Sequence, residues 1–145
     1  MRRIGVVERE TTFDGLEVLS ADECRRLLSQ TAVGRLAMVG DRVPELRPVN
    51  YVLEGDAVVV RTGEGRILQA ARRGEAAALE IDDVDPLEHT GWSVIVTGTL
   101  RERTADEGTR ALPLRAWGSG AKDRFVSVAI ETVSGRRIPS GKGNR

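Results

Sequence analysis

Residues 45–63 read ELRPVNYVLEGDAVVVRTG, a run that predicts two strands joined by a tight turn. Both halves are rich in Val, Leu and Tyr, which strands favour. Glu54, Gly55 and Asp56 separate the halves, and glycine beside an acidic residue is typical of a hairpin turn. Pro48 lies inside the first half. Because proline has no N–H to donate, that strand is expected to be bulged or to lie at a sheet edge there.

Similar apolar runs on both sides of this hairpin predict further strands. They lie at residues 33–39, 76–81, 92–103 and 125–133. In the long run that begins at Trp92, Val94 and Val96 alternate with Ile95 and Thr97, which is the pattern of a strand with one buried face. The strands follow one another mostly as neighbouring hairpins. That order favours an antiparallel sheet over strand–helix–strand alternation.

Short helices are predicted beside the strands. Ser20 and Glu23 form a capping box, and the helix that follows places Cys24, Leu27 and Leu28 on one face. The capping box therefore predicts the first helix of a globular domain.

The fold class follows from the full set of elements. A second helix follows the glycine-rich turn after the hairpin and ends at Gly74, and residues 104–107 form another capping box that opens a third. About six strands and two or three short helices make the fold mainly β, an antiparallel barrel with peripheral helices. Residues 1–19 are expected to form an N-terminal arm, 20–138 the domain, and 139–145 a flexible tail.

Length and composition fit one globular domain. The 145 residues include 22 acidic and 22 basic side chains, so net charge is zero and generic binding to nucleic acid is not expected. No apolar run reaches the roughly 20 residues that span a bilayer. The start of the chain lacks the apolar segment of a signal peptide, and a cytoplasmic location is therefore expected. With a single cysteine and a single histidine, neither an internal disulfide nor a zinc site is expected.

Residues 82–86, DDVDP, are expected to form an acidic loop after a strand. Its carboxylates could bind a hard cation, but a solvated loop is the expected role, so no metal site is assigned. No arrangement of Ser, His and Asp or of Cys and His indicates nucleophilic catalysis. Catalytic residues therefore stay unassigned.

The first candidate binding site is the segment Arg61-Thr62-Gly63-Glu64-Gly65-Arg66. It joins the end of a strand to a glycine-rich turn and the start of a helix, where free N–H groups attract phosphate oxygens. Arginine can bind phosphate through two parallel hydrogen bonds, and the hydroxyl of Thr62 can add another. The same residues also fit an ordinary connection with surface arginines. Their spacing matches neither the dinucleotide fingerprint nor the Walker loop.

Two further segments could contact a flat ligand. One is the run Arg47, Pro48, Val49 and Asn50. Pro48 frees main-chain groups from the sheet, so a planar ligand could bond to the main chain at Val49 and Asn50, although an edge strand with a bulge explains the pattern equally. The other is Trp92 with Ser93, where the indole could cover a flat ring or hold a subunit interface.

Taken in order, these segments resemble the pyridoxamine 5'-phosphate oxidase-like flavin-binding split barrels, from about Ser20 to Ile138. The similar stretches are Val33-Gly34-Arg35-Leu36-Ala37, Pro48-Val49-Asn50-Tyr51, Arg61-Thr62-Gly63, Gly91-Trp92-Ser93-Val94 and Gly135-Arg136-Arg137-Ile138. The order of helices and strands also matches. The resemblance implies an antiparallel split β-barrel that binds FMN.

The resemblance also implies a role for each segment. The strand that holds Arg47 to Asn50 would lie along the isoalloxazine ring. Arg61 and Thr62 would contact the flavin phosphate and ribityl chain. Gly65 and Arg66 fall near the basic phosphate ligand of the family, although the family often has an Arg-Lys pair where this chain has Arg66 and then isoleucine.

The family site lies between two subunits, so the resemblance implies a homodimer with two equivalent sites. Trp92 and Ser93 fall where the second subunit reaches the flavin. The true oxidase carries a histidine-containing C-terminal segment, whereas this chain has Gly135-Arg136-Arg137-Ile138 and a glycine-rich tail. Pyridoxamine phosphate oxidase activity is therefore not expected.

Three functions are compatible with this resemblance, because proteins of one fold catalyse many different reactions. The first is an FMN-dependent oxidoreductase with a small-molecule redox substrate. The second is a reductase that uses a deazaflavin cofactor. The third is a non-catalytic flavin or haem binding protein, with His89 as the candidate haem ligand.

Overall fold

The computed structural model describes residues 15–115 and 120–139. Its strands are β1 (Glu17–Val18), β2 (Val33–Met38), β3 (Glu45–Glu54), β4 (Ala57–Thr62), β5 (Ala76–Asp85), β6 (Thr90–Arg103) and β7 (Arg124–Ile138). Its helices are α1 (Ala21–Gln30), α2 (Arg66–Arg72) and α3 (Glu107–Arg110). Most of the predicted N-terminal arm and of the predicted flexible tail lies outside the described residues.

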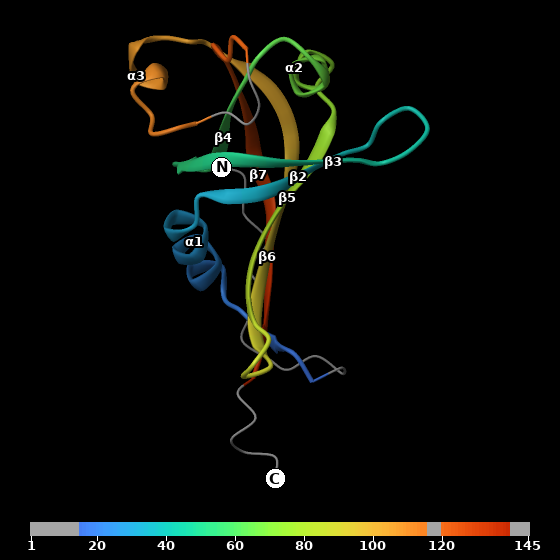
Figure 1. The fold of residues 1–145 in the computed structure, drawn as a ribbon, viewed down its shortest axis with the longest axis vertical. Coiled ribbons are helices and arrows are strands. Elements are labelled where there is room, and N and C mark those ends of the chain that lie inside the picture. Colours follow the sequence, from blue (N-terminus) through green and yellow to red (C-terminus); the bar gives the residue numbers. More distant parts are fainter. Residues whose placement is uncertain (1–14, 116–119, 140–145) are drawn as a thin grey trace.

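The strands close into an antiparallel barrel. Their order is β1-β7-β4-β3-β2-β5-β6, and β6 pairs back with β7, so the six long strands form a ring and β1 adds to its edge. In Figure 1, β5, β6 and β7 run together along the long axis, well below the end that carries α2 and α3. The predicted mainly β antiparallel barrel with short peripheral helices is confirmed.

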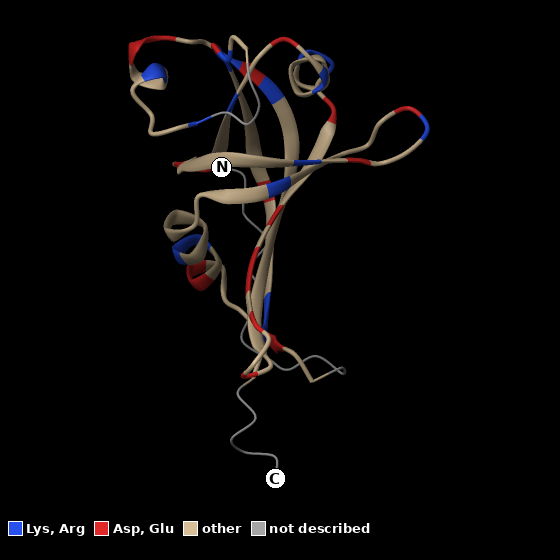
Figure 2. Cartoon of the chain, in the orientation of Figure 1, with Lys and Arg blue, Asp and Glu red and all other residues tan. Residues whose placement is uncertain are grey.

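Alternation along the strands separates the core from the outer surface. On β6, Val94 and Val96 are fully buried while Ile95 between them is 41% exposed. Opposite faces of a strand alternate with each residue, so one face of β6 fills the barrel and the other faces outward. Acidic and basic residues are interspersed over the described elements rather than gathered by sign, as Figure 2 shows.

The first helix forms where the capping box predicts it. The Ser20 hydroxyl accepts a hydrogen bond from the Glu23 N–H at 3.2 Å, which satisfies one of the free donors of the first turn. Cys24, Leu27 and Leu28 are buried against the barrel. No helix among the described residues is long and apolar enough to cross a membrane.

The acidic stretch corrects the prediction of a loop at residues 82–86. β5 continues through Asp85, and its ladder with β6 runs on from Ile81↔Val94 to Asp85↔Thr90. Pairing with β6 thus overrides the low strand propensity of aspartate. Because successive strand residues point to opposite faces, Asp82 lies on one face and Asp83 and Asp85 on the other, and the described residues contain no group of three or more side chains that could hold a metal ion.

Other element boundaries also differ from those predicted. β7 continues to Ile138, and the third helix is capped by Asp106, whose side chain accepts from Thr109 N, rather than by the box at residues 104–107. The predicted N-terminal arm ends in β1, which pairs with β7, and Leu19 after it is fully buried. Long-range pairing with β7 therefore orders the last residues of that segment.

Candidate functional site

The barrel is split along the first half of β3. The ladder between β3 and β2 runs from Glu45 to Asn50, whereas the ladder between β3 and β4 begins only at Tyr51. Residues 45–49 therefore have a strand neighbour on one side and an open edge on the other. Pro48 pairs with Arg35 in an unbroken register, so the strand lies at an edge there and is not bulged.

The hydrogen-bond direction along β3 determines which main-chain groups face that edge. Tyr51 N donates to the Ala32 carbonyl at 3.0 Å, so the main-chain N–H and C=O of Tyr51 point toward the β2 side. Because direction alternates along an antiparallel strand, the main-chain groups of Val49 also point toward β2, those of Asn50 point toward β4, and the carbonyl of Pro48 points toward the open edge. The missing N–H of Pro48 therefore costs no bond to β2.

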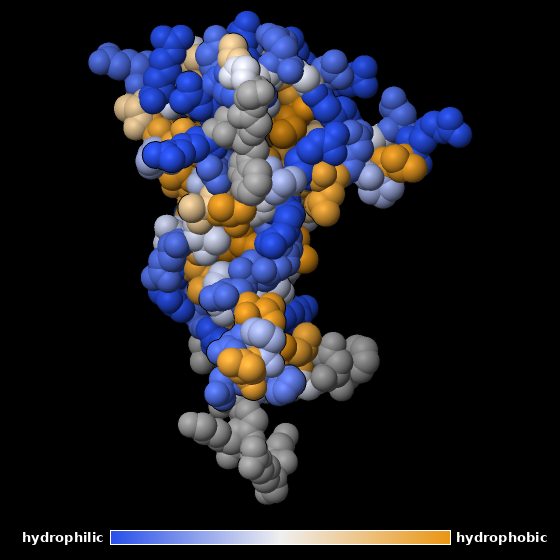
Figure 3. Space-filling model, in the orientation of Figure 1, coloured by the Kyte–Doolittle hydropathy of each residue, from blue (hydrophilic) through white to orange (hydrophobic). Residues whose placement is uncertain are grey.

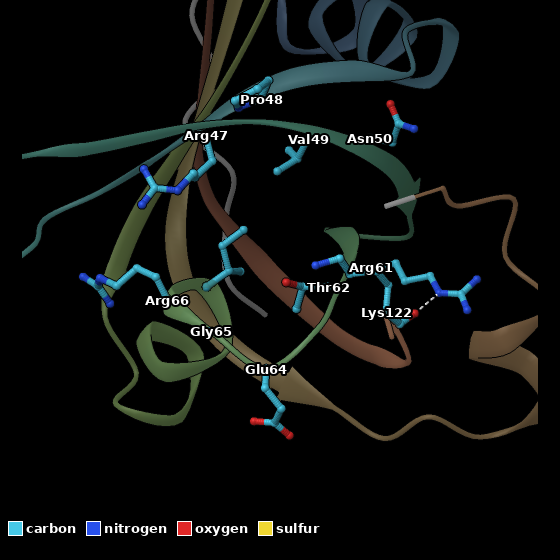
Figure 4. Close-up of a pocket in the computed structure, with 11 residues that line it drawn as sticks. Arg47, Pro48, Val49, Asn50, Arg61, Thr62, Glu64, Gly65, Arg66 and Lys122 are labelled. Atoms are coloured by element: carbon cyan, nitrogen blue, oxygen red, sulfur yellow. Dashed lines mark hydrogen bonds between the residues drawn. The ribbon is translucent and has the colours of Figure 1, made fainter. Parts of the chain in front are cut away.

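A cavity of about 220 Å³ lies between this open edge, the end of β4 and the start of α2 (Figure 4). The residues that line it are Arg47, Pro48, Val49, Asn50, Arg61, Thr62, Glu64, Gly65, Arg66, Ile67 and Lys122. The structure thus brings together the two segments that the sequence analysis selected separately, the β3 strand and the turn after β4.

The β3 residues contribute differently from what the sequence analysis expected. Val49 points its side chain into the cavity in Figure 4, while its main-chain groups are turned toward β2. The expected main-chain contact at Val49 is therefore replaced by an apolar wall. The carbonyl of Pro48 points toward the open edge, and the main-chain groups of Asn50 lie on the β4 side. Arg47 lies at the rim, where its guanidinium donates to the Leu46 carbonyl at 3.0 Å.

Arg66 is engaged by two carboxylates. Its Nε donates to Glu45 Oε1 at 2.6 Å, and its two terminal nitrogens bind the Glu75 carboxylate at 2.9 and 2.8 Å. These hydrogen bonds raise the pKa of Arg66 and lower the pKa of Glu75. The three residues come from α2, β3 and the residue before β5, so the ion pairs tie together the elements around the cavity.

Arg61 is turned away from the cavity. Its Nε donates to the Lys122 carbonyl, and its guanidinium carbon lies 5.8 Å from the centroid of the Phe125 ring. Figure 4 shows this guanidinium directed outward, while the Thr62 hydroxyl faces the cavity. Of the two residues predicted to contact a phosphate together, only Thr62 is directed toward the cavity.

Lys122 is a cavity residue that the sequence analysis missed. It precedes β7, and its side-chain nitrogen points into the cavity from the side opposite β3 (Figure 4). Within the described part of the chain, Lys122 has no ion pair. The nearest acidic wall residue, Glu64, directs its carboxylate away from the cavity and pairs with Arg124 at 3.3 Å. Among the residues that the structure describes, no carboxylate therefore balances the charge of Lys122 in this cavity.

Trp92 and Ser93 do not join this cavity in a single chain. They line a separate hollow of about 270 Å³ on the long extension of β6 and β7, with Arg136 and Arg137 beside them. His89 lies in the exposed turn between β5 and β6, with a left-handed φ of 53°.

Comparison with known proteins gives consistent matches. The family described as pyridoxamine 5'-phosphate oxidase matches residues 20–137. An uncharacterised protein of Mycobacterium tuberculosis is 35% identical over 127 residues, which cover 83% of this chain and 84% of that protein. A solved FAD-binding protein from Mycobacterium smegmatis is 32% identical with a TM-score of 0.66, covering 83% of this chain and 95% of that one. An FAD-binding protein from Mesorhizobium loti is 26% identical with a TM-score of 0.71, covering 84% and 96%.

Proposed function

The chain belongs to the pyridoxamine 5'-phosphate oxidase family, and from that premise we propose that it binds a flavin, FMN in the first instance, in the cavity beside β3. One observation carries this proposal. The open edge of β3 and the turn after β4 meet in a single cavity that has a main-chain edge at one end and, at the other, a cation that forms no ion pair with a described residue. A flavin combines a flat, hydrogen-bonding ring with a negatively charged phosphate, so it matches both ends.

The residues present fit such a ligand. Val49 and Ile67 supply apolar contacts for a ring, and Pro48 turns its carbonyl to the open edge. Thr62 supplies a hydroxyl and Lys122 a positive charge for a phosphate. When bound, a flavin supplies the electron-transfer chemistry, and the protein binds and orients it. We therefore propose an oxidoreductase with a small-molecule substrate, distinct from a true pyridoxamine phosphate oxidase.

The position of Trp92 and Ser93 supports a second part of the proposal, a homodimer. In one chain they line a hollow separate from the cavity beside β3. In a twofold dimer each partner can present its own Trp92 hollow to the other's cavity, which gives two equivalent sites. The proposed dimer therefore accounts for both groups of predicted residues with one kind of site.

The first experiment is an absorbance spectrum of the purified protein, alone and during titration with FMN and with FAD. Saturable binding of FMN supports the proposal. The two solved relatives are named as FAD-binding, so FAD is the main competitor. Binding of FAD more than about tenfold tighter, a difference of ~1.4 kcal/mol, would change the cofactor to FAD. A chain that binds neither flavin would contradict the proposal.

The alternatives are tested in the same titration. Preferential binding of a deazaflavin would favour a deazaflavin-dependent reductase. A Soret band on addition of haem that disappears in His89→Ala would favour a haem-binding protein, with the ligand in the turn between β5 and β6. Reduction of the bound flavin by a nicotinamide cofactor, followed by reoxidation, would support a catalytic role over a carrier.

A further inference from the structure

The basic side chains around the cavity differ in whether they already form ion pairs with neighbouring carboxylates. Arg66 uses its Nε and both terminal nitrogens on Glu45 and Glu75. A guanidinium held by two carboxylates cannot turn to a phosphate without breaking three charge-assisted hydrogen bonds to part-buried groups, which is costly. Ile67, the next residue, lines the cavity and brings no charge. The start of α2 therefore supplies no available side-chain cation.

Lys122 has the opposite environment. It is half-buried, lines the cavity, and has no ion pair with any described residue. Figure 4 shows its nitrogen directed toward the Thr62 side of the cavity. An ammonium in this position is free to bind an anion, and burial of its stem limits the entropy lost on binding.

The turn after β4 leaves room for the lysine. A Cβ added to Gly63 would lie 2.5 Å from the Ala121 carbonyl oxygen, 3.3 Å from Lys122 Cδ and 3.5 Å from Lys122 Nζ. Any side chain at position 63 would therefore displace the segment that carries Lys122. Arg61 holds the same segment from the other side, because its Nε donates to the Lys122 carbonyl and its guanidinium packs over Phe125.

From these contacts we infer that Lys122 binds the phosphate of the flavin in this chain. Arg61 and Gly63 act as positioning residues for it, and Arg66 holds the surrounding elements together without contacting the ligand. This inference rests on the proposed function, since it assigns the residue that recognises one part of the proposed ligand. It places the phosphate-binding charge on the segment before β7, about 60 positions from the turn that provides the hydroxyl.

The test compares FMN with riboflavin, which has the same ring and lacks the phosphate. Dissociation constants for both ligands are measured by fluorescence titration for the wild type, Lys122→Ala, Lys122→Arg and Gly63→Ala. Lys122→Ala should weaken FMN binding by about 10- to 100-fold, the range of a lost charged hydrogen bond, and leave riboflavin binding unchanged. Lys122→Arg should restore most of the FMN affinity. Gly63→Ala should reproduce the selective loss.

Arg26→Ala is the matched control, because Arg26 lies on α1 and its guanidinium contacts only Gln30 in the described residues. Retained riboflavin binding shows that each variant is folded. Equal losses for FMN and riboflavin, or no loss for FMN in Lys122→Ala, would overturn the assignment of Lys122 while flavin binding itself stands. A wild type that binds neither ligand would instead overturn the proposed function.

Discussion

Arg61 and Lys122 form a unit in which one side chain fixes the main chain of the other. Arg61→Ala should therefore weaken FMN binding by about 1.5–3 kcal/mol, although its guanidinium is turned away from the cavity. If it acts through Lys122, the double variant Arg61→Ala/Lys122→Ala should lose less than the sum of the single losses. Calorimetric titration of the four proteins gives the coupling energy. Strictly additive losses would mean that Arg61 contacts the ligand independently.

The ion pair between Arg66 and Glu75 should make the stability of the fold depend on pH. Hydrogen bonds from Arg66 are the largest cause of the lowered pKa of Glu75. A folded-state pKa below the ordinary 4.5 means that the carboxylate stabilises the fold above about pH 4.5, and that this contribution is lost as pH falls through the folded-state value. Glu75→Gln should therefore lower the melting temperature at neutral pH and flatten its decline in acid.

Melting temperatures from about pH 7 to about pH 3 provide the measurement. Glu88→Gln, in the exposed turn between β5 and β6, serves as the control and should leave the acid profile near that of the wild type. If Glu75→Gln shows the same decline as the wild type, the pair contributes nothing to acid sensitivity and Arg66 would be available for another role.

What the sequence predicts about single residues depends on whether their type constrains the backbone. Pro48 and Gly65 were found because proline and glycine mark edges and turns, and Thr62 was found because it stands beside that turn. Lys122 gives no comparable signal. It sits between an alanine and an aspartate in a segment without periodicity, and its contact with Arg61 spans 61 positions. Only the closed barrel brings it to the cavity.

At the scale of elements, Tyr51 joins α1 to the strand that forms the site. Its buried hydroxyl donates to the Leu28 carbonyl at 2.6 Å, and burial raises its pKa. Tyr51→Phe keeps the ring and removes this bond, so it should lower the free energy of unfolding by about 0.5–1.5 kcal/mol. Urea denaturation measures the loss.

The same variant should also weaken flavin binding, because Tyr51 is the point at which β3 leaves β4 and begins its open edge. Thr104→Val, which removes an exposed hydroxyl between β6 and α3, is the control and should change neither quantity. A loss of stability in Tyr51→Phe with unchanged flavin affinity would show that α1 supports the barrel without positioning the edge.

The element predictions succeed where local pattern and long-range pairing agree. The strands β2, β3 and β4 alternate or run apolar between clear turns, and the structure places them within one residue of the predicted bounds. At Asp82 to Asp85 the two disagree, because aspartate favours loops while β6 offers a pairing partner. The ladder prevails there. The predicted start of the third helix is wrong for another reason. Thr104 and Asp106 are both acceptable N-cap residues, but only Asp106 accepts a hydrogen bond from a main-chain N–H of the first turn, that of Thr109.

At the scale of the whole molecule, the outer face of the long sheet is unusual for a solvent-exposed surface. Alternation and register place Val33, Val84, Ile95 and Ile138 on this face, and each is at least 41% exposed. Figure 3 shows further hydrophobic side chains near the lower end and on the projecting hairpin between β2 and β3. Exposed apolar side chains on one face of a sheet, here set among the charged Arg35, Glu80 and Asp82, are typical of an interface between proteins.

The proposed homodimer can be tested at this face. Ile95→Arg places a charge at its centre, beside Ser134 and Glu80 in the neighbouring strands. We expect the wild type to sediment as a dimer and Ile95→Arg as a monomer, because a long charged side chain at this position would have to lose its water on association. Val43→Arg, on the projecting hairpin, adds the same charge outside this face and should stay dimeric.

Flavin affinity distinguishes a dimer in which the partner completes each flavin site from a dimer whose interface contributes nothing to the site. If the partner's Trp92 and Ser93 complete each cavity, monomeric Ile95→Arg should lose affinity for FMN and for riboflavin alike, since a stacked indole acts on the ring and not on the phosphate. This pattern differs from that of Lys122→Ala, which is selective for FMN. A monomer that binds riboflavin as tightly as the dimer would show that one chain suffices for the ring, and that the Trp92 hollow has another occupant.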